Sequence, residues 1–164
     1  MTEFTWTLLA NVDKPKWILI GFQTDKNVTQ EQNPALFDHL NLTRAHVFVN
    51  SQKFPLHDIS LNFARNDYED AYTMQNIFKE KYYGFNNLIG GSQINYPGFK
   101  TLFPIFVFDV TNQDDLIKNI APTINVNFYF RENTPVNAVV YAVVISDRLY
   151  KMKADGTDIV KVTR

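Results

Sequence analysis

Short runs of β-branched and aromatic residues recur along this chain, and few of them are separated by a helical pattern. The clearest run is residues 124–130, in which Ile, Val and Phe alternate strictly with Asn and Tyr. Successive side chains of a strand point to opposite faces, so this run has one apolar face and one polar face. That arrangement is typical of an antiparallel sheet that buries one side, whereas parallel strands need crossover helices between them.

Strand character extends through most of the sequence. The segments that show it are Phe4–Leu9, Lys16–Phe22, Arg44–Asn50, Phe103–Val110, Ile124–Phe130, Ala138–Ile145, Leu149–Lys153 and Thr157–Val162. Phe, Tyr and Trp together make up 15% of the residues, and aromatic side chains favour strands. We therefore predict an all-β fold, an antiparallel eight-stranded jelly-roll sandwich that forms a single domain over residues 1–164.

One segment follows a helical period instead. Between Asn66 and Tyr83, apolar residues recur at steps of three and four positions. Asn66 or Asp67 is expected to cap the first turn, and Gly84 follows the last turn, where helices commonly end. The sequence therefore predicts one inserted α-helix, about Asn66–Tyr83.

Three further segments, between or beside the predicted strands, are predicted to form a loop, a short helix and a hairpin turn. Residues 85–97 are rich in Asn and Gly, which predicts a long exposed loop. Residues 111–119 begin with cap residues and end before Pro122, which predicts a short helix. Asp155-Gly156 lies between the last two predicted strands and is a strong signal for a two-residue hairpin turn.

Three of the predicted strands are apolar on both faces: Trp17–Phe22, Ile105–Phe108 and Ala138–Ile145. The solvent face of an antiparallel sandwich is normally polar, and the inserted helix can cover only part of one sheet. Either another domain or subunit covers the rest, or the long loops of the chain fold over it. Because large exposed apolar patches are rare on monomers, we expect a partner. The candidate interface or packing residues are Trp17, Leu19, Phe22, Tyr68, Tyr72, Phe106, Phe108, Tyr141 and Val143.

The polar residues form no recognisable catalytic pattern. His39, His46 and His57 are not spaced to hold a metal from one helix, and Asp114-Asp115 fits the acidic first turn of a helix. Cysteine is absent, which excludes thiol nucleophiles and cysteine-based metal sites. We expect no catalytic, cofactor-binding or metal-binding residues and no enzymatic activity.

Charge and hydropathy argue against nucleic acid and a membrane span as the main partners of this chain. The 16 basic and 17 acidic residues give a net charge of −1, and the basic residues are scattered, so there is no strong nucleic-acid signal. The longest apolar run, Ala138–Ile145, is far shorter than the ~20 residues that a membrane-spanning helix needs. The first residues lack the pattern of a secretion signal, so we expect a protein that is not secreted.

Several blocks of sequence, taken in order, resemble one family. They are Pro15–Thr24, Phe37–Leu42, Val49–Ser51, Phe54-Pro55, Leu61–Phe63, Tyr82-Tyr83, Pro104–Asp109, Asn133–Ala138 and Val144–Arg148. Their order and spacing resemble the C-terminal jelly roll of the double-jelly-roll major capsid proteins of Polinton/Maverick and adintovirus-like elements, including related open reading frames in animal genomes. The likeness extends from about Trp6 to Val162, although only one jelly roll fits into 164 residues.

This resemblance implies a structural, capsid-type assembly protein that self-associates through its β-sandwich surfaces. The chain would be half of a viral major capsid subunit or a genome-resident derivative of one. In such capsids two rolls form a subunit and three subunits form a capsomer. The implied partner is therefore the chain itself or a sister jelly-roll domain, with a trimer as one possible homo-oligomer. No cofactor is implied.

The expected location follows from the same resemblance: the virion for a viral gene, and otherwise the cytoplasm or nucleus. A different class of function stays open beside it. A lectin-like jelly-roll binding module would present Tyr and Asn side chains at its loop tips to a carbohydrate, without capsid assembly.

Overall fold

The computed structural model describes residues 1–8, 12–26, 31, 33–84, 94–113 and 122–147, and the backbone of 150–154 and 159–163. Its strands are β1 (Glu3–Leu8), β2 (Pro15–Thr24), β3 (Leu42–Val49), β4 (Gln52–Phe54), β5 (Phe106–Asp109), β6 (Ile124–Phe130), β7 (Ala138–Ser146), β8 (Tyr150–Ala154) and β9 (Ile159–Thr163). Its helices are α1 (Glu69–Tyr83), α2 (Tyr96–Thr101) and one 3₁₀ turn, Phe63–Arg65.

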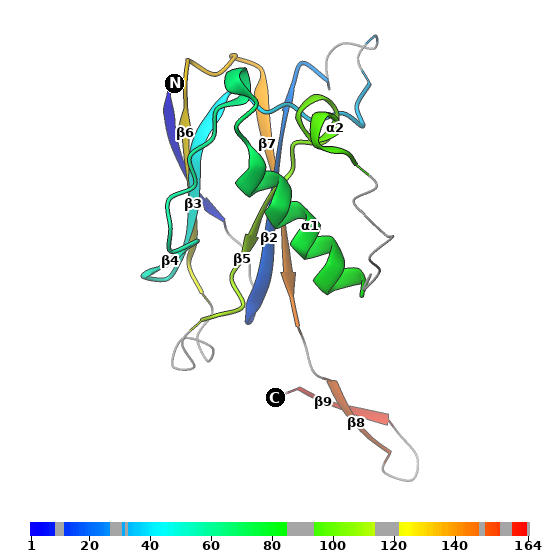
Figure 1. Ribbon diagram of the computed structural model, residues 1–164. Coiled ribbons are helices and arrows are strands. Elements are labelled where there is room, and N and C mark those ends of the chain that lie inside the picture. The colour runs from blue at the N-terminus through cyan, green and yellow to red at the C-terminus, as the bar shows by residue number, and fades with distance from the viewer. Residues whose placement is uncertain are drawn as a thin grey trace.

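The strands pair in a nested, antiparallel order: β3 with β4, β2 with β5, and β1 with β6. A long antiparallel ribbon that folds over on itself produces this nesting, which is the connection pattern of a jelly roll. β6 pairs in addition with β3, and β7 pairs with the free side of β2. The result is two antiparallel sheets, ordered β1-β6-β3-β4 and β5-β2-β7, which enclose the core (Figure 1).

The core between the two sheets is built from alternate residues of each strand. In β6 the predicted alternation is confirmed, since all four apolar residues are buried and the three polar positions between them are half-buried. Phe22 of β2 lies at the centre, and its ring meets those of Phe106, Phe128 and Phe130 edge-on at centroid distances of 6.0, 5.1 and 5.6 Å. Edge-to-face aromatic pairs of this kind stabilise a core beyond the apolar area that they bury.

The predicted set of strands needs two corrections. Within the described residues, seven strands form the two sheets, while β8 and β9 pair only with each other and lie beyond the end of β7 (Figure 1). The short strand β4 was not predicted, because the turn signal at Pro55 overlaps it. It forms because Phe54 pairs with Val47 of β3 and is buried in the core.

Helix α1 starts later than the sequence predicts, at Glu69 instead of Asn66. Asn66 has a left-handed backbone (φ 57°) and ends the preceding 3₁₀ turn, while Asp67 bridges back across that turn. Tyr68 is the residue before the first turn, and its side chain makes no capping bond. The predicted end is confirmed: Gly84 has a φ of 68°, which a residue without a Cβ adopts at little cost.

Helix α2 lies partly where the sequence predicts an exposed loop, so that prediction is wrong for Tyr96 and Pro97. The Asn95 side chain caps the helix by accepting a hydrogen bond from the Gly98 N–H at 2.8 Å, and Pro97 lies in the first turn. Phe99 is fully buried and anchors the helix to the core.

Other predicted features fall wholly or partly outside the described residues. They include residues 85–93 of the predicted loop and residues 114–119 of the predicted short helix; residues 111–113 are described and are not helical. Asp155-Gly156 also lies outside. The pairing of Ala154 with Ile159 nevertheless leaves four residues between β8 and β9, whereas the turn signal predicts two.

Candidate functional site

The outer face of the sheet β5-β2-β7, turned away from the core, is the candidate site. The strand register arranges its side chains in rows across the sheet. From one end to the other these rows are Asp109 with Trp17 and Ile145, Val107 with Leu19 and Val143, Gly21 with Tyr141, and Gln23 with Val139. Most of these side chains are apolar, so the face must either be covered or remain as an apolar surface.

Helix α1 covers the part of this face that β5 and β2 form (Figure 1). Phe78 of the helix packs edge-on against Trp17 with ring centroids 5.2 Å apart, and both side chains are buried. With Val107 they form a second apolar cluster, separate from the main core. The partly buried side chains packed against this cluster are Leu19, Met74, Ile105 and Ile145.

An ion pair lies beside this cluster. The Lys81 ammonium of α1 lies 3.0 Å from the Asp109 carboxylate of β5. Burial by itself would raise the pKa of Asp109, but hydrogen bonds from the hydroxyl and backbone N–H of Thr111, and the nearby Lys81 charge, outweigh it and lower the pKa. Asp109 is therefore held as a carboxylate that fixes the helix to β5.

A second cover lies over the other end of β2 and consists of residues 33–38. Phe37 packs directly on Gly21: a Cβ added to that glycine would lie 2.6 Å from two carbons of the Phe37 ring. The Phe37 N–H donates to the Leu102 carbonyl at 3.0 Å, and the Asp38 N–H donates to the Phe22 carbonyl at 2.8 Å. Glycine suits position 21 because the Phe37 ring lies so close to the backbone that a Cβ would fit only if the ring or the backbone moved.

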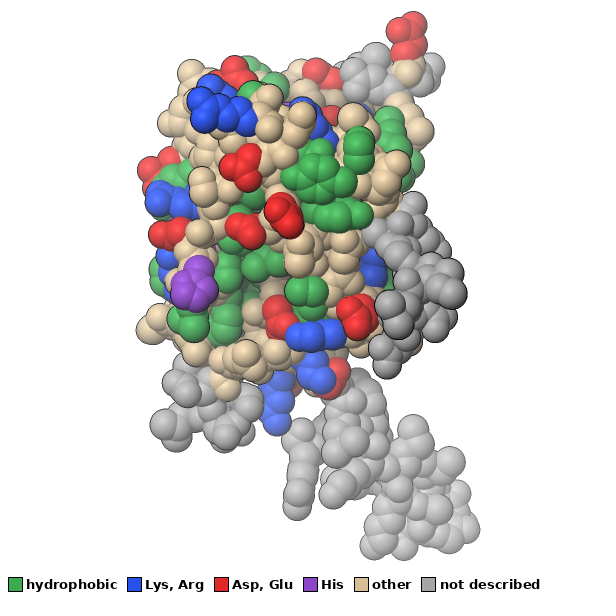
Figure 2. All heavy atoms as spheres, in the orientation of Figure 1, with side chains coloured by type: hydrophobic (Ala, Val, Ile, Leu, Met, Phe, Trp, Pro, Cys, Tyr) green, Lys and Arg blue, Asp and Glu red, His purple; other side chains and the backbone are tan. Residues whose placement is uncertain are grey.

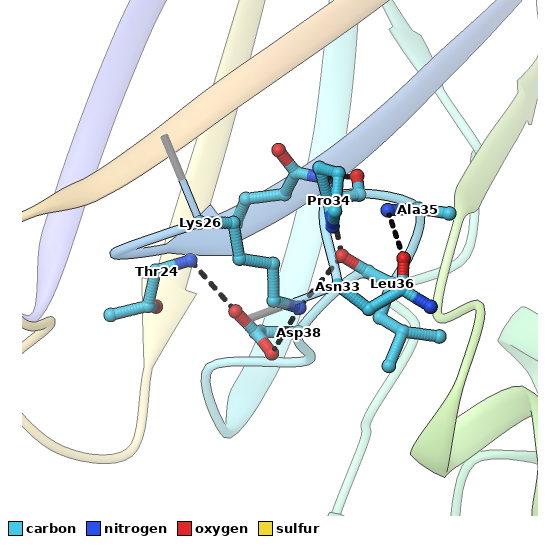
Figure 3. A network of polar contacts seen from close by, with 8 residues as sticks. Thr24, Lys26, Asn33, Pro34, Ala35, Leu36 and Asp38 are labelled. Carbon is cyan, nitrogen blue, oxygen red and sulfur yellow. Dashed lines mark hydrogen bonds and ion pairs between the residues drawn. The ribbon is translucent and has the colours of Figure 1, made fainter. Parts of the chain in front are cut away.

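Polar contacts tether this cover to the end of β2 (Figure 3). The Lys26 ammonium lies 3.0 Å from one Asp38 carboxylate oxygen and donates to the Leu36 carbonyl at 2.7 Å, while the Thr24 N–H donates to the other carboxylate oxygen at 2.8 Å. Gln23 donates to the Pro34 carbonyl at 2.7 Å. Because the Lys26 side chain is only 7% exposed, this ion pair is well shielded from water.

Strand β7 has no comparable cover among the described residues. Its outward side chains Val139, Tyr141 and Val143 are 41%, 39% and 57% exposed. The alternate, core-facing residues of β7 are only half-buried, whereas Ile18 and Ile20 of the neighbouring β2 are completely buried. β7 is thus an apolar strand at a sheet edge, and it is exposed on its outer face.

The residues singled out from the sequence fall into three groups. Those buried within the chain, and therefore engaged in its own packing, are Trp17, Phe22, Tyr68, Phe106 and Phe108. Leu19 and Tyr72 are half-buried. Tyr141 and Val143 are exposed on β7, together with Val139, which was not among the residues expected from the sequence. The two-residue period of the run Ala138–Ile145 places Val139 on the same face, and this was the signal that could have found it.

The outer face of the other sheet is mostly polar, and no helix of the described residues covers it. Its central row is Thr5, Asn127 and His46, and the Arg44 guanidinium lies 4.1 Å from the Tyr129 ring centre beside it. His46 Nε2 lies 3.0 Å from the Asn127 amide nitrogen, while His46 Nδ1 and Asn127 Oδ1 are buried without a hydrogen-bond partner. Burial, followed by the charges of Lys53 and Arg44, lowers the pKa of His46, although Asp58 opposes the shift.

The described residues contain no group of three or more His, Asp or Glu side chains that could hold a metal ion. Basic and acidic side chains are interspersed on the face that Figure 2 shows, where hydrophobic side chains gather near α2. A pocket of about 120 Å³ lies beside Asn62 and Arg131, well below the roughly 300–1,000 Å³ of most small-molecule sites. In the described part of the chain no helix is long and apolar enough to cross a membrane.

Comparison with known proteins identifies one family. The family model for the double jelly roll-like domain matches residues 1–150, which include both sheets, α1 and the exposed strand β7. No curated protein and no solved structure matches the chain. The nested strand pairing and the extent of the match agree, and the chain belongs to the double jelly roll-like domain family.

Proposed function

We propose that this protein is a capsid-type assembly protein that associates with copies of itself through a surface of its β-sandwich. The observation that carries the proposal is the apolar outer face of β7, since Val139, Tyr141 and Val143 are exposed within a domain whose family model covers residues 1–150. Assembly domains need apolar surfaces that the isolated subunit leaves exposed, because obligate interfaces resemble a protein core cut in half.

A finer assignment belongs to the same proposal. The ordered blocks that resemble Polinton/Maverick and adintovirus-like capsid proteins support a role as one jelly roll of a major capsid subunit or as a genome-resident derivative. The protein then lies in the virion where the gene is viral, and in the cytoplasm or nucleus where a host genome retains it. Its partner is a second copy or a sister jelly-roll domain, and assembly involves no turnover and no cofactor.

Light scattering coupled to size-exclusion chromatography tests the proposal, with the 164-residue chain applied at about 1 to 200 micromolar. We expect an apparent mass that rises with concentration from the 19.0 kDa monomer. Negative-stain electron microscopy of the same fractions is expected to show rings or larger closed particles. A chain that stays monomeric throughout, with no particles on the grid, contradicts self-assembly.

A binding module is the second candidate, and the outer face of the four-stranded sheet favours it. On that face the half-buried Asn127 and Tyr129 lie beside the buried His46, and one polar atom each of Asn127 and His46 has no hydrogen-bond partner. Planar aromatic and amide side chains are suited to sugar rings and hydroxyls. A glycan array distinguishes the two: specific glycan binding that Asn127→Ala and Tyr129→Ala abolish, in a protein that stays monomeric, would favour the module.

A further inference from the structure

The edges of the two sheets differ in how well they could accept another strand. Edge strands are commonly protected by shortness, by charge or by proline. β4 has three residues and contains Lys53, β5 has four and ends with Asp109, and β1 has six and begins with Glu3. β7 has nine residues, Ala138–Ser146, and none of them is charged, proline or glycine. Among the described strands, β7 therefore has the longest edge and the least protected one.

The sequence of β7 is close to self-complementary when it runs antiparallel to itself. A two-fold axis at Ala142 pairs Tyr141 with Val143 of the second copy and Val139 with Ile145 on the outer face. On the inner face it pairs Val140 with Val144. Every one of these pairs joins β-branched or aromatic side chains, which are the cross-strand pairs that stabilise antiparallel sheets. Pairing about Ala142 also aligns all nine residues, with Ala138 opposite Ser146.

In this register, charged groups lie only beyond the two ends of the paired strands. Asn137 lies one residue before β7 and Asp147 one residue after it, and this register places Asn137 opposite Asp147 of the second copy. Asn137 donates a hydrogen bond to Asp25 at 2.6 Å, and Asp147 is ion-paired with Lys16. The Asn137–Asp25 pair of one copy therefore faces the Lys16–Asp147 pair of the other. Each end then gathers one ammonium group, that of Lys16, and two carboxylates, those of Asp147 and of Asp25 from the other copy, while the nine paired residues themselves carry no charge.

We infer that two copies of this chain associate through β7, edge to edge and antiparallel about Ala142, so that the sheet β5-β2-β7 continues into its counterpart as six strands. This inference rests on the proposed self-association and names its geometry. Main-chain hydrogen bonds supply the attraction and the outer-face residues supply the register, as in other cases of strand addition. Three partly exposed side chains bury less than the ~800 Å² per partner of a standard interface, so the dimer is concentration-dependent.

Disulfide trapping tests the register, and the absence of cysteine in the chain gives a clean background. Directly opposed residues of antiparallel strands have Cα atoms roughly 4.5–5.5 Å apart, within the range of a disulfide. Ala142→Cys is expected to form a covalent dimer in high yield under mild oxidation. Thr5→Cys, at an exposed position on the edge strand β1 of the other sheet, is the matched control and is expected to stay mostly monomeric.

A second pair of variants fixes the register without altering the inner face. Tyr141→Cys and Val143→Cys are each expected to cross-link poorly alone and to form a heterodimer when mixed. In the cysteine-free chain, Val143→Lys is expected to raise the dimer dissociation constant at least tenfold, whereas Thr5→Lys leaves it within twofold. Far-UV circular dichroism confirms that each variant is folded.

The outcomes separate this inference from the broader proposal. Suppose that light scattering shows oligomers, but that Ala142→Cys and the mixture of Tyr141→Cys with Val143→Cys cross-link no more than Thr5→Cys. This result would overturn pairing through β7 and would still support self-assembly. A protein that is monomeric at every concentration and does not cross-link would overturn both. If the monomer instead binds a sister jelly-roll domain and Val143→Lys blocks this binding, the edge takes a different partner and the homodimer is wrong.

Discussion

β2 and β7 are neighbours in one sheet and both are apolar on their two faces, yet the outer face of β2 is buried and that of β7 is exposed. β2 is buried on its outer face by α1 at one end and by residues 33–38 at the other. β7 pairs with β2 along its whole length and leaves Val139, Tyr141 and Val143 exposed. Apolar residues on both faces of a strand therefore predict that both faces are to be buried. They do not predict which part of the protein buries them, and this differs even between two adjacent strands.

The largest expected effect comes from removing the contact between β2 and its helix. Trp17→Ala deletes a buried indole that packs on Phe78, and we expect a loss of about 3–5 kcal/mol in the free energy of unfolding. Tyr141→Ala, on the exposed strand, is the matched control and is expected to cost well under half of that. Urea denaturation of both variants at low protein concentration measures the difference. Equal losses would show that the two strands are covered to the same extent in the monomer.

The second cover of β2 is tested at Gly21. Gly21→Ala places a methyl group 2.6 Å from the Phe37 ring, so that either the ring or the backbone must move, at an expected cost of about 1–3 kcal/mol. Phe37→Leu provides space, and the double variant is expected to lose less than the sum of the two single losses. Additive losses in urea denaturation would mean that Phe37 does not pack on this glycine.

Removing the polar contacts that hold residues 33–38 on the end of β2 is expected to lower the stability somewhat less. Lys26→Met removes the cation that neutralises Asp38 and one of the two donors to the Leu36 carbonyl, the other being the Gln23 amide, and we expect a loss of about 1–2 kcal/mol. Lys53→Met breaks the more exposed ion pair with Asp58 and is expected to cost less than the Lys26 substitution. Thermal melts of the two variants provide the measurement, and a larger loss at Lys53 would contradict the shielding of the Lys26 pair.

The smallest expected effect is a pH dependence at His39, which lies just beyond the cover. Burial, followed by the charge of Lys100, lowers the pKa of His39 from 6.5, although Asp38 opposes the shift. The Asn41 N–H donates to His39 Nδ1 at 3.0 Å, so protonation of that nitrogen breaks the bond. The unfolded chain takes up this proton near pH 6.5 and the folded chain only at lower pH. The stability contributed by neutral His39 is therefore complete above pH 6.5 and decreases as the pH falls below it.

His39→Asn checks the sign of this effect. The amide oxygen can accept from the Asn41 N–H and does not titrate, so we expect the decrease in Tm between pH 7.5 and 5.5 to be smaller than in the parent chain. Loss of the ring stacked on Phe63 at 4.2 Å is expected to lower Tm at both pH values. An unchanged pH dependence would contradict the role assigned to His39, and His46, whose pKa is also lowered, would then be the residue to substitute.

Local patterns predicted the elements whose signals lie within a few residues. In β6, the alternation of apolar and polar residues sets which face is buried. After α1, Gly84 permits the left-handed backbone that ends the helix. The start of α1 was predicted wrongly, since Asn66 had two possible roles and the 3₁₀ turn before it used its left-handed conformation. Helix α2 was missed although Asn95 and Pro97 mark its start, because the Gly- and Asn-rich residues before it have a stronger loop signal.

The sequence by itself determined a β-rich sandwich, one long helix, the absence of cysteine chemistry and the three strands that need cover on both faces. Only the tertiary structure decided which of those strands the chain covers itself: α1 and residues 33–38 cover β5 and β2, whereas the outer side chains of β7 remain exposed among the described residues. The physical reason is that hydrophobicity acts on the area removed from water and carries no direction. A pattern of apolar residues therefore specifies that a face is buried, while the path of the chain specifies what buries it.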